Sequence, residues 1–379
     1  MDQHCFAPIV QFGTSRFLQA HVDFFVSQAL EQGAAIGKIA MVQTTDNPGS
    51  TARIKALASG EPYPVHIQGL QDGKPVDIMC WSSSVQQAVH AASQWPLLRQ
   101  AFVSDIKVVI SNTGDQGYGL TDTDNVHLLA ADAGAPISFP AKLLVLLHGR
   151  WQSNPDEPIS LFPCELVARN GDILRNIVIE LGVEWGLDEA FCDYLKLQCR
   201  WANSLVDRIV SQALEPVGAV AEPYALWAIE QQSGLTLPCT HPAIVVTDDL
   251  DHYERLKLFI LNAGHTYLAE RWLLDKRDAD ETVYQAMNSE ELREDLEAMW
   301  SEEVLPVFAA LGQMSSAQAY LETVRDRFLN PFLNHRIADI AGNHSMKKLR
   351  RMLPIVELAG QRVTDLAQPK LKAALASDC

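Results

Sequence analysis

Continuous runs of apolar residues mark the first half of the chain. They lie at residues 7–12, 38–43, 105–111 and 159–163. A continuous run, unlike an alternating one, is typical of a strand in a parallel sheet that is covered on both faces. The amphipathic stretch at about residues 17–32 predicts a helix between the first two runs. Strand, glycine turn, helix and strand in this order predict the first βαβ unit of a dinucleotide-binding fold.

The pattern changes twice further along. Residues 62–81 alternate around the turn dipeptide Asp72-Gly73, which predicts an antiparallel hairpin. From about residue 171 onward helical periodicity dominates, and the strand pattern is confined to residues 243–247. The expected helices lie near residues 139–148, 172–181, 188–198, 204–212, 251–273, 280–286, 289–311 and 316–329, with a last helical region from about 347.

These elements predict an α/β N-terminal Rossmann-type domain followed by a mainly α-helical C-terminal domain. A length of 379 residues suits two domains at about 150 residues per domain. We expect residues 1–185 to form the dinucleotide-binding domain and residues 186–379 to form the helical substrate and catalytic domain.

Charge and cysteine spacing argue against several classes of protein. The formal net charge of −17 argues against a nucleic-acid or anionic-membrane binder, because both need a basic face. The seven cysteines are scattered without a CxxC pair, so we expect neither a disulfide framework nor a metal site. We expect no signal peptide, because the N-terminus lacks a basic segment followed by a long apolar stretch, and no transmembrane helix, because no run approaches roughly 18 apolar residues. A cytoplasmic protein is therefore expected.

The first candidate for cofactor binding is Gly13-Thr14-Ser15-Arg16-Phe17, which follows a predicted strand and opens a helix. A pyrophosphate needs close approach of the backbone and free N–H groups at a helix N-terminus, and Gly13 supplies the tight turn. Ser15 stands where a second glycine is usual, so the dinucleotide-binding fingerprint is incomplete. An ordinary strand-to-helix turn has the same pattern.

Two more segments lie where parallel strands are expected to end, and open α/β sheets bind ligands there. Thr45 and Asp46 follow the second strand, and Asp46 is the candidate for the cofactor's ribose hydroxyls. Asn112 and Thr113 follow the strand at 105–111 and can bind ribose or nicotinamide, although an ordinary turn has the same composition. Asp46 favours NAD as the cofactor and leaves NADP open.

The most informative set is Lys257, Asn262 and His265 within KLFILNAGH. At about 100° per residue, Asn262 lies about 140° and His265 about 80° from Lys257 around an α-helix, so all three fit one broad face. Desolvation lowers the pKa of a lysine in such an apolar stretch. A lysine of this kind can take a proton from an alcohol and return it to a carbonyl. Asn262 can donate to a developing alkoxide, and His265 can hold a neighbouring hydroxyl.

These residue types also have plain structural interpretations. A lysine can extend its stem along an apolar surface, an asparagine can cap a turn, and a histidine can be satisfied in a core. Taken alone, these interpretations outweigh the catalytic one. The run Lys347, Lys348, Arg350 and Arg351 is basic in a very acidic chain, and such a run is more often a solvated face than an anion site.

Taken together and in order, the segments resemble the mannitol dehydrogenase family, the long-chain polyol-specific dehydrogenases, over residues 9–354. The Lys-x4-Asn-x2-His spacing belongs to this resemblance. Three segments, FPCELVARNGD, NSLVDRIV and EPYALWAIE, look closest to the tagaturonate and fructuronate reductases, which are the altronate and mannonate oxidoreductases. The other matching segments are GTSRFLQAHVDFF, ISNTGDQGY, KLFILNAGHTYLA and RFLNPFLNHRIADIAGNHSMKKLRRMLP.

The resemblance implies metal-independent hydride transfer with Lys257 as general acid/base, and with Asn262 and His265 orienting and polarising the reacting C–O group. It implies a sugar acid (hexuronate or aldonate) or a polyol as the substrate, and the basic run would suit a carboxylate. The candidates for substrate binding are Asn170, His335, Asn343 and Lys347.

Two other functions fit the same residues. A polyol-phosphate dehydrogenase, resembling mannitol-1-phosphate 5-dehydrogenase, would keep the chemistry and use the basic run for phosphate. A non-catalytic dinucleotide-binding sensor would bind cofactor without turnover, although the intact Lys-Asn-His set argues against it. We expect a small-molecule partner, no nucleic acid, no membrane, and a monomer or small homo-oligomer.

Overall fold

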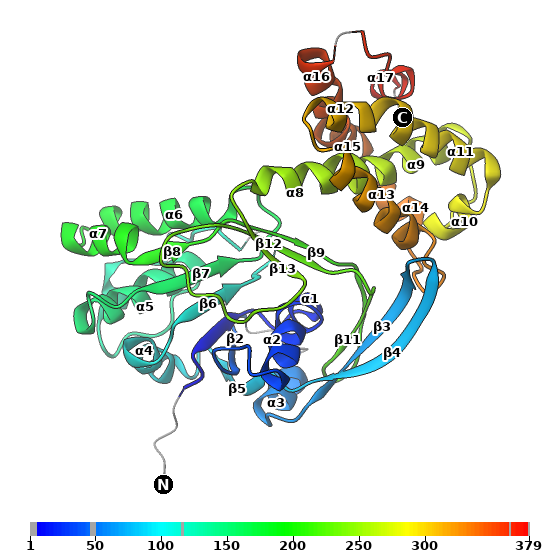
Figure 1. Ribbon diagram of the computed structural model, residues 1–379. Helices are drawn as coiled ribbons and strands as arrows, with labels where there is room; N and C mark the ends of the chain where they lie inside the picture. Colours follow the sequence, from blue (N-terminus) through cyan, green and yellow to red (C-terminus); the bar gives the residue numbers. More distant parts are fainter. Residues whose placement is uncertain (1–5, 46–50, 115–116, 364, 378–379) are drawn as a thin grey trace. The chain divides into compact units, whose positions relative to one another are not determined.

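The computed structural model describes residues 6–45, 51–114, 117–363 and 365–377, and the chain forms two compact units (Figure 1). Unit 1 comprises Met1–His66, Met79–Ala221 and Ala225–Leu250, and unit 2 comprises Ile67–Ile78, Glu222–Tyr224 and Asp251–Cys379. The boundary expected at residues 185/186 lies inside unit 1, because strands that follow it join the sheets of that unit.

Unit 1 is built on a six-stranded parallel sheet with the strand order β5-β2-β1-β6-β7-β8. Strands β1, β2, β6 and β7 are buried at every residue, as expected for parallel strands covered on both faces. β1 pairs with β2 on one side and with β6 on the other, so the strand order reverses between β1 and β6. The strands are β1 Ile9–Phe12, β2 Ile39–Gln43, β5 Val85–His90, β6 Val108–Ser111, β7 Ile159–Pro163 and β8 Cys199–Trp201.

Helices cover this sheet, and α4 to α7 lie beside strands β6 to β8 (Figure 1). The helix expected at 17–32 is two helices, α1 and α2, separated by Ala20 and His21. The core between sheet and helices includes Phe12, which packs against Phe102 and Phe139 with ring centroids 6.3 and 5.2 Å away. The helices are α1 Arg16–Gln19, α2 Val22–Glu31, α3 Thr51–Ala58, α4 Trp95–Ser104, α5 Phe139–Ser153, α6 Asn170–Glu184 and α7 Glu189–Leu197, with a 3₁₀ turn η2 at Val126–Leu129.

The remaining strands form two smaller sheets, one of four strands and one of three. The expected hairpin is confirmed as β3 (Tyr63–Gln71) and β4 (Lys74–Ser82), joined by Asp72 and Gly73, which both have positive φ as this turn requires. The sheets have the orders β10-β11-β3-β4 and β13-β12-β9. Their other strands are β9 Ser204–Asp207, β10 Val210–Ala213, β11 Ala219–Ala221, β12 Leu226–Glu230 and β13 Ile244–Thr247.

The prediction of a helix at residues 204–212 is wrong, because β9 and β10 occupy this segment. The prediction that strands nearly vanish after residue 171 is also wrong. The apolar residues at 205, 206, 209 and 210 fit a helical period, but Val206, Ile209 and Val210 are β-branched and favour strands. Antiparallel pairing of β9 with β12 decides between the two, because it buries this segment against a strand about 20 residues further along the chain.

Unit 2 is mainly helical, which confirms the expected fold class (yellow to red in Figure 1). The helices expected at 251–273 and 289–311 are present, but each contains a π-helical segment, η3 and η4. Among the described residues, no helix combines the length and apolar character needed to cross a membrane. The elements are α8 Leu250–Leu256, η3 Lys257–Asn262, α9 Ala263–Leu274, α10 Val283–Met287, α11 Glu290–Ala298, η4 Met299–Val304, α12 Leu305–Ala310, α13 Met314–Phe328, α14 Ile337–Ala341, α15 His344–Arg351, α16 Leu353–Arg362 and α17 Pro369–Ala376.

Candidate active site

The turn after β1 in unit 1 has a backbone that only glycine fits. Gly13 has a φ of 114°, and a Cβ at this position would lie 2.5 Å from the carbonyl oxygen of Asn112. Its N–H donates to the carbonyl oxygen of Val42 at 3.0 Å, and Nε2 of Gln19 donates to the carbonyl oxygen of Thr14 at 3.0 Å. The turn thus lies against the ends of β2 and β6, where a dinucleotide pyrophosphate requires close approach of the backbone.

The residues that follow Gly13 differ in exposure. Thr14 is nearly buried, whereas Arg16 is exposed. Ser15 is the N-cap of α1, and its Oγ accepts from a backbone N–H at 3.4 Å, which accounts for a hydroxyl residue where a second glycine is usual. Phe17 is half-buried and stacks on His21 with ring centroids 4.8 Å apart.

The ends of β2 and β6 carry the other cofactor candidates. Thr45 is exposed, and its carbonyl oxygen accepts from Nε2 of Gln43 at 2.9 Å. Asp46 lies outside the described residues. Asn112 is half-buried, and its Nδ2 donates to the carbonyl oxygen of Cys164 at 2.8 Å, which ties the end of β6 to the end of β7. The described candidates of unit 1 therefore meet at the carboxyl edge of the sheet, around its switch point.

A buried carboxylate organises the loop after β6. Glu165 Oε1 accepts from both the N–H and the Oγ1 of Thr113 at 3.0 Å, and Oε2 accepts from the hydroxyls of Ser111 at 3.0 Å and Tyr118 at 3.1 Å. Burial, together with the charge of Glu165, raises the pKa of Tyr118 far above its usual value. Tyr118 therefore stays a neutral donor, and the network holds Thr113 in place.

The side-chain amide of Asn170 makes all its hydrogen bonds to backbone groups. Its Nδ2 donates to the carbonyl oxygens of Pro163, Glu165 and Ser204 at 2.9–3.2 Å, and its Oδ1 accepts from the N–H groups of Gly171 and Ser204 at 2.9 Å. An amide group has two N–H hydrogens and two lone pairs, so none of its hydrogen-bonding capacity remains. This differs from the substrate contact that the sequence predicted, because Asn170 joins three backbone segments instead.

The candidate catalytic residues of unit 2 lie on η3 and the start of α9. The π-helical hydrogen bonds of η3 join residues five apart, so Lys257 and Asn262 follow each other on one face. This corrects the separation of about 140° expected for a regular α-helix. Thr266 continues the face one turn later, and its Oγ1 donates to the carbonyl oxygen of Asn262 at 2.9 Å. Lys257 and Asn262 are both half-buried.

Trp300 of η4 braces this π-helical turn from the side. Its Nε1 donates to the carbonyl oxygen of Ile260, within η3, at 3.0 Å. A Cβ at Gly264 would lie 2.5 Å from the Trp300 ring, so the indole also requires glycine on α9. Trp300 in turn packs against Phe328 with ring centroids 5.6 Å apart. The geometry of η3 therefore depends on two elements that follow it in the chain.

The structure brings His265, His335 and Lys347 together within unit 2. His265 is buried, stacks on Phe328 at 4.3 Å and meets the edge of His335 at 4.9 Å. Burial lowers the pKa of His335, the charge of Lys347 lowers it further, and Asp339 opposes both. His335 is therefore neutral at pH 7 and can exchange hydrogen bonds with a polar ligand.

The remaining candidate, Asn343, is exposed. It precedes α15 with a left-handed backbone, φ 55°, and makes no side-chain capping bond. Two residues of this region, Thr266 and Trp300, were not singled out from the sequence, and Arg351 was named only as a member of the basic run. The spacing of four residues between Asn262 and Thr266 is the signal that could have found Thr266. Trp300 has no such local signal.

Family comparisons cover almost the whole chain. Residues 7–238 match the mannitol dehydrogenase Rossmann domain, and residues 249–379 match the mannitol dehydrogenase C-terminal domain. The chain belongs to the mannitol dehydrogenase family. It is a dehydrogenase acting on CH–OH groups. Within the described residues, no group of three or more His, Cys, Asp and Glu side chains is placed to hold a metal ion.

Several known proteins are similar to this dehydrogenase. The altronate oxidoreductase of Halalkalibacterium halodurans is 30% identical over 367 residues, which cover 91% of this chain and 69% of the relative. The altronate oxidoreductase of Klebsiella pneumoniae (strain 342) is 30% identical over 397 residues, which cover 97% of this chain and 78% of the relative.

Two solved structures share the fold of the dehydrogenase. A substrate-free D-sorbitol dehydrogenase has a TM-score of 0.81 at 20% identity, covering 98% of this chain and 80% of that one. The mannitol 2-dehydrogenase of Pseudomonas fluorescens, in a ternary complex with NAD and D-mannitol, has a TM-score of 0.73 at 18% identity. The match covers 98% of this chain and 79% of that one.

Proposed function

We propose that this dehydrogenase is an NAD-dependent oxidoreductase of a sugar acid, with Lys257 as its general acid/base. The observation that carries the proposal is the π-helical turn that places Lys257 and Asn262 on one face. The substrate class is supported by the altronate oxidoreductases to which the chain is similar. The cofactor is supported by the Gly13 turn, whose backbone is open only because no Cβ is present.

In this proposal the residues of unit 1 hold the dinucleotide. The segment Gly13–Phe17 would approach the pyrophosphate through its backbone, Thr45 and Asp46 would face the ribose, and Asn112 and Thr113 would contact the nicotinamide half. The nicotinamide supplies the hydride acceptor for alcohol oxidation and the hydride donor for ketone reduction. The buried network of Glu165 would keep Thr113 in place during the reaction.

The residues of unit 2 would handle the proton and the reacting oxygen. Lys257 Nζ takes the hydroxyl proton during oxidation and returns it to the oxygen during reduction. Asn262 donates to the oxygen that becomes negative in between. His265, fixed between Phe328 and His335, holds a neighbouring hydroxyl. A second hydroxyl or the carboxylate would reach His335 and Lys347.

The test is turnover followed at the reduced-nicotinamide absorbance. NADH and NADPH are assayed with keto-hexuronates and ketoses, and the oxidised cofactors with aldonates, polyols and polyol phosphates, in the presence of EDTA. We expect the best kcat/KM with a sugar acid and NAD(H). Polyol phosphates as the best substrates would favour the phosphate-specific alternative, and cofactor binding without any turnover would favour a sensor.

Lys257→Ala tests the acid/base role. Positioned proton transfer contributes about 10²- to 10⁴-fold, so we expect kcat to fall by this factor while the cofactor Kd is unchanged. Lys372→Ala, at an exposed lysine of α17, is the matched control and should keep full activity. Full turnover by Lys257→Ala would refute the assignment.

A further inference from the structure

Two half-buried cations on α15 hydrogen-bond only to neutral groups within the described part of the chain. Nζ of Lys347 donates to the carbonyl oxygen of Ile340 at 2.7 Å, and Nη1 of Arg351 donates to Oγ1 of Thr266 at 3.1 Å. The two residues are four apart on the helix, so their side chains are neighbours on one face. A guanidinium carries five N–H donors, and the bond to Thr266 uses one of them.

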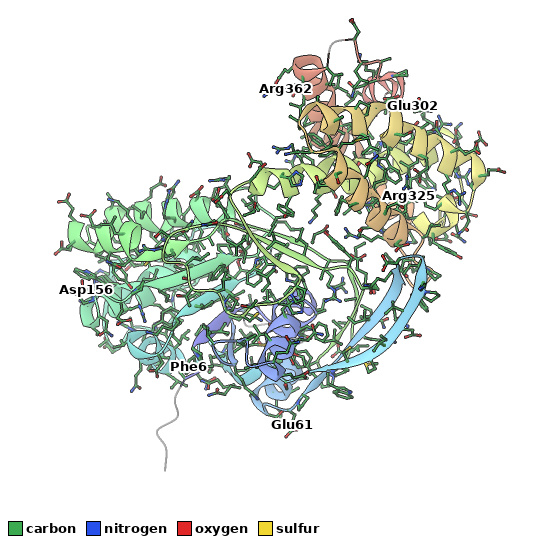
Figure 2. All side chains as sticks on the ribbon, viewed as in Figure 1. Phe6, Glu61, Asp156, Glu302, Arg325 and Arg362 are labelled. Atoms are coloured by element: carbon green, nitrogen blue, oxygen red, sulfur yellow. The ribbon has the colours of Figure 1, made fainter. Side chains whose placement is uncertain are left out.

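At least seven other Lys and Arg side chains in the described part of unit 2 have a carboxylate partner. Arg325, labelled in Figure 2, pairs with Glu297 and Glu322 at 2.6 Å. Lys348, the neighbour of Lys347, pairs with the buried Glu270 at 3.2 Å. The same kind of pairing is made by Arg271, Arg277, Arg327, Arg336 and Lys370. In a chain with 47 acidic residues, a half-buried pair of cations that faces neutral oxygens is therefore not explained by a shortage of acids.

Their surroundings disfavour the charge that they carry. Burial lowers the pKa of Lys347, and the charge of Arg351 lowers it further. Burial also lowers the pKa of Arg351. Half-burying two like charges side by side costs free energy unless an anion offsets it. An anion between them would satisfy the free donors and remove the repulsion.

Thr266 connects this pair to the candidate catalytic face. It lies one α-helical turn, about 6 Å, beyond Asn262. Its Oγ1 accepts from Arg351 and donates to the carbonyl oxygen of Asn262 at 2.9 Å. The guanidinium of Arg351 therefore contacts the residue one turn beyond Asn262, whose amide would hold the reacting oxygen. A sugar acid has its carboxylate and its reacting carbon separated by a few carbon atoms along one chain.

We propose that Arg351, together with Lys347, binds the carboxylate of the substrate. The planar guanidinium would bind both carboxylate oxygens, and Lys347 would add a point charge. This inference rests on the proposed function, because it assigns the group that distinguishes a sugar acid from a neutral polyol. Arg351 would thus determine specificity, whereas Lys257, Asn262 and His265 would act on the reacting carbon.

The test compares Arg351→Gln with Arg351→Lys and with Arg350→Gln, an exposed arginine of the same helix. Each variant is assayed with an aldonate, the alditol of the same carbon skeleton and the alditol phosphate. Loss of a charge-assisted hydrogen bond weakens binding by a factor of about 10 to 150 in the dissociation constant. We therefore expect Arg351→Gln to raise KM for the aldonate by this factor. KM of Arg351→Gln for the alditol should equal that of the wild type. KM of Arg351→Lys for the aldonate should lie between those of the wild type and of Arg351→Gln, and Arg350→Gln should behave like the wild type.

Several results would overturn the inference. An equal loss for aldonate and alditol would mean that Arg351 only maintains the fold. A selective loss for the alditol phosphate would mean that the pair binds phosphate and not carboxylate. Wild-type turnover of the aldonate with an unaffected Arg351→Gln variant would refute this inference and leave the proposed function standing.

Direct binding separates this inference from the proposed function. If the wild type turns over no substrate, the proposed function fails, and titration calorimetry with the aldonate then decides the anion site by itself. Aldonate binding by the wild type that Arg351→Gln abolishes would support the site. No aldonate binding by the wild type would overturn it.

Discussion

Replacing Trp300 by Phe would remove the side chain that braces the π-helical turn η3. Trp300 is fully buried, and its Nε1 donates to the carbonyl oxygen of Ile260 at 3.0 Å. Loss of a donor to a buried carbonyl costs about 1–3 kcal/mol, and the smaller ring leaves a void that costs about 1 kcal/mol more. We therefore expect the free energy of unfolding to fall by about 2–4 kcal/mol, which most domains survive.

The variant should lose activity for a separate, geometric reason. Lys257 and Asn262 share a face only while the turn between them is π-helical, since five residues of α-helix would rotate them apart by about 140°. Misplacement of a reacting group by about 1 Å can cost about 100-fold in rate. We expect kcat of Trp300→Phe to fall by about this factor while the cofactor Kd, which depends on unit 1, stays unchanged.

Trp272→Phe is the matched control, because it makes the same substitution on the neighbouring helix α9. Trp272 is half-buried, and its Nε1 donates to the carbonyl oxygen of Asp278 at 2.7 Å. This variant should lose at most about 1 kcal/mol and no activity. Urea unfolding and initial rates measure both effects. A Trp300→Phe variant with normal kcat would refute the link between this brace and the alignment of Lys257 with Asn262.

Two further predictions concern unit 1. Gly13→Ala would place a Cβ 2.5 Å from the carbonyl oxygen of Asn112 at positive φ. We expect the free energy of unfolding to fall by about 1–3 kcal/mol and NADH binding, measured by fluorescence titration, to weaken at least about tenfold. Gly134→Ala, with open space around it, should change neither quantity. Burial raises the pKa of Asp23 from 3.8 to about 7, so the folded protein favours its protonated form, and this stabilisation is lost as pH rises from about 4 to about 7. Urea unfolding should show Asp23→Asn gaining up to about 4 kcal/mol on the wild type across this range, and a constant difference would contradict the buried state of the carboxyl.

The parallel sheet was predictable because burial on both faces leaves a continuous apolar run in the sequence. β1, β2, β6 and β7 each have this pattern, and all four were placed correctly. The segment at 204–212 was not predictable in this way, because its apolar spacing fits a helix and a strand equally. Its partner β12 decided the outcome, and tertiary pairing of this kind is absent from a local pattern.

The site was predictable to the extent that its chemistry is local in sequence. Lys257, Asn262 and His265 were named as candidates from their residue types and spacing, but the α-helical angle expected between the first two was wrong, because η3 is a π-helix. Asn170 was named as a candidate for substrate binding, yet its hydrogen bonds to three backbone segments depend on the fold. A basic run is equally ambiguous, because only the partners of each side chain separate a solvated face from an anion site.

The spacing of the catalytic candidates has a physical interpretation. On an α-helix a residue shares a face with those three and four positions away, so a lysine and an asparagine five apart would not act on one oxygen. One π-helical turn corrects this offset, and the next α-helical step brings Thr266 onto the same row. Arg351 then meets that row at Thr266. A single irregular turn, held by a tryptophan from another helix, thus aligns the proposed acid/base and oxyanion groups with Thr266, the residue that Arg351 of α15 contacts.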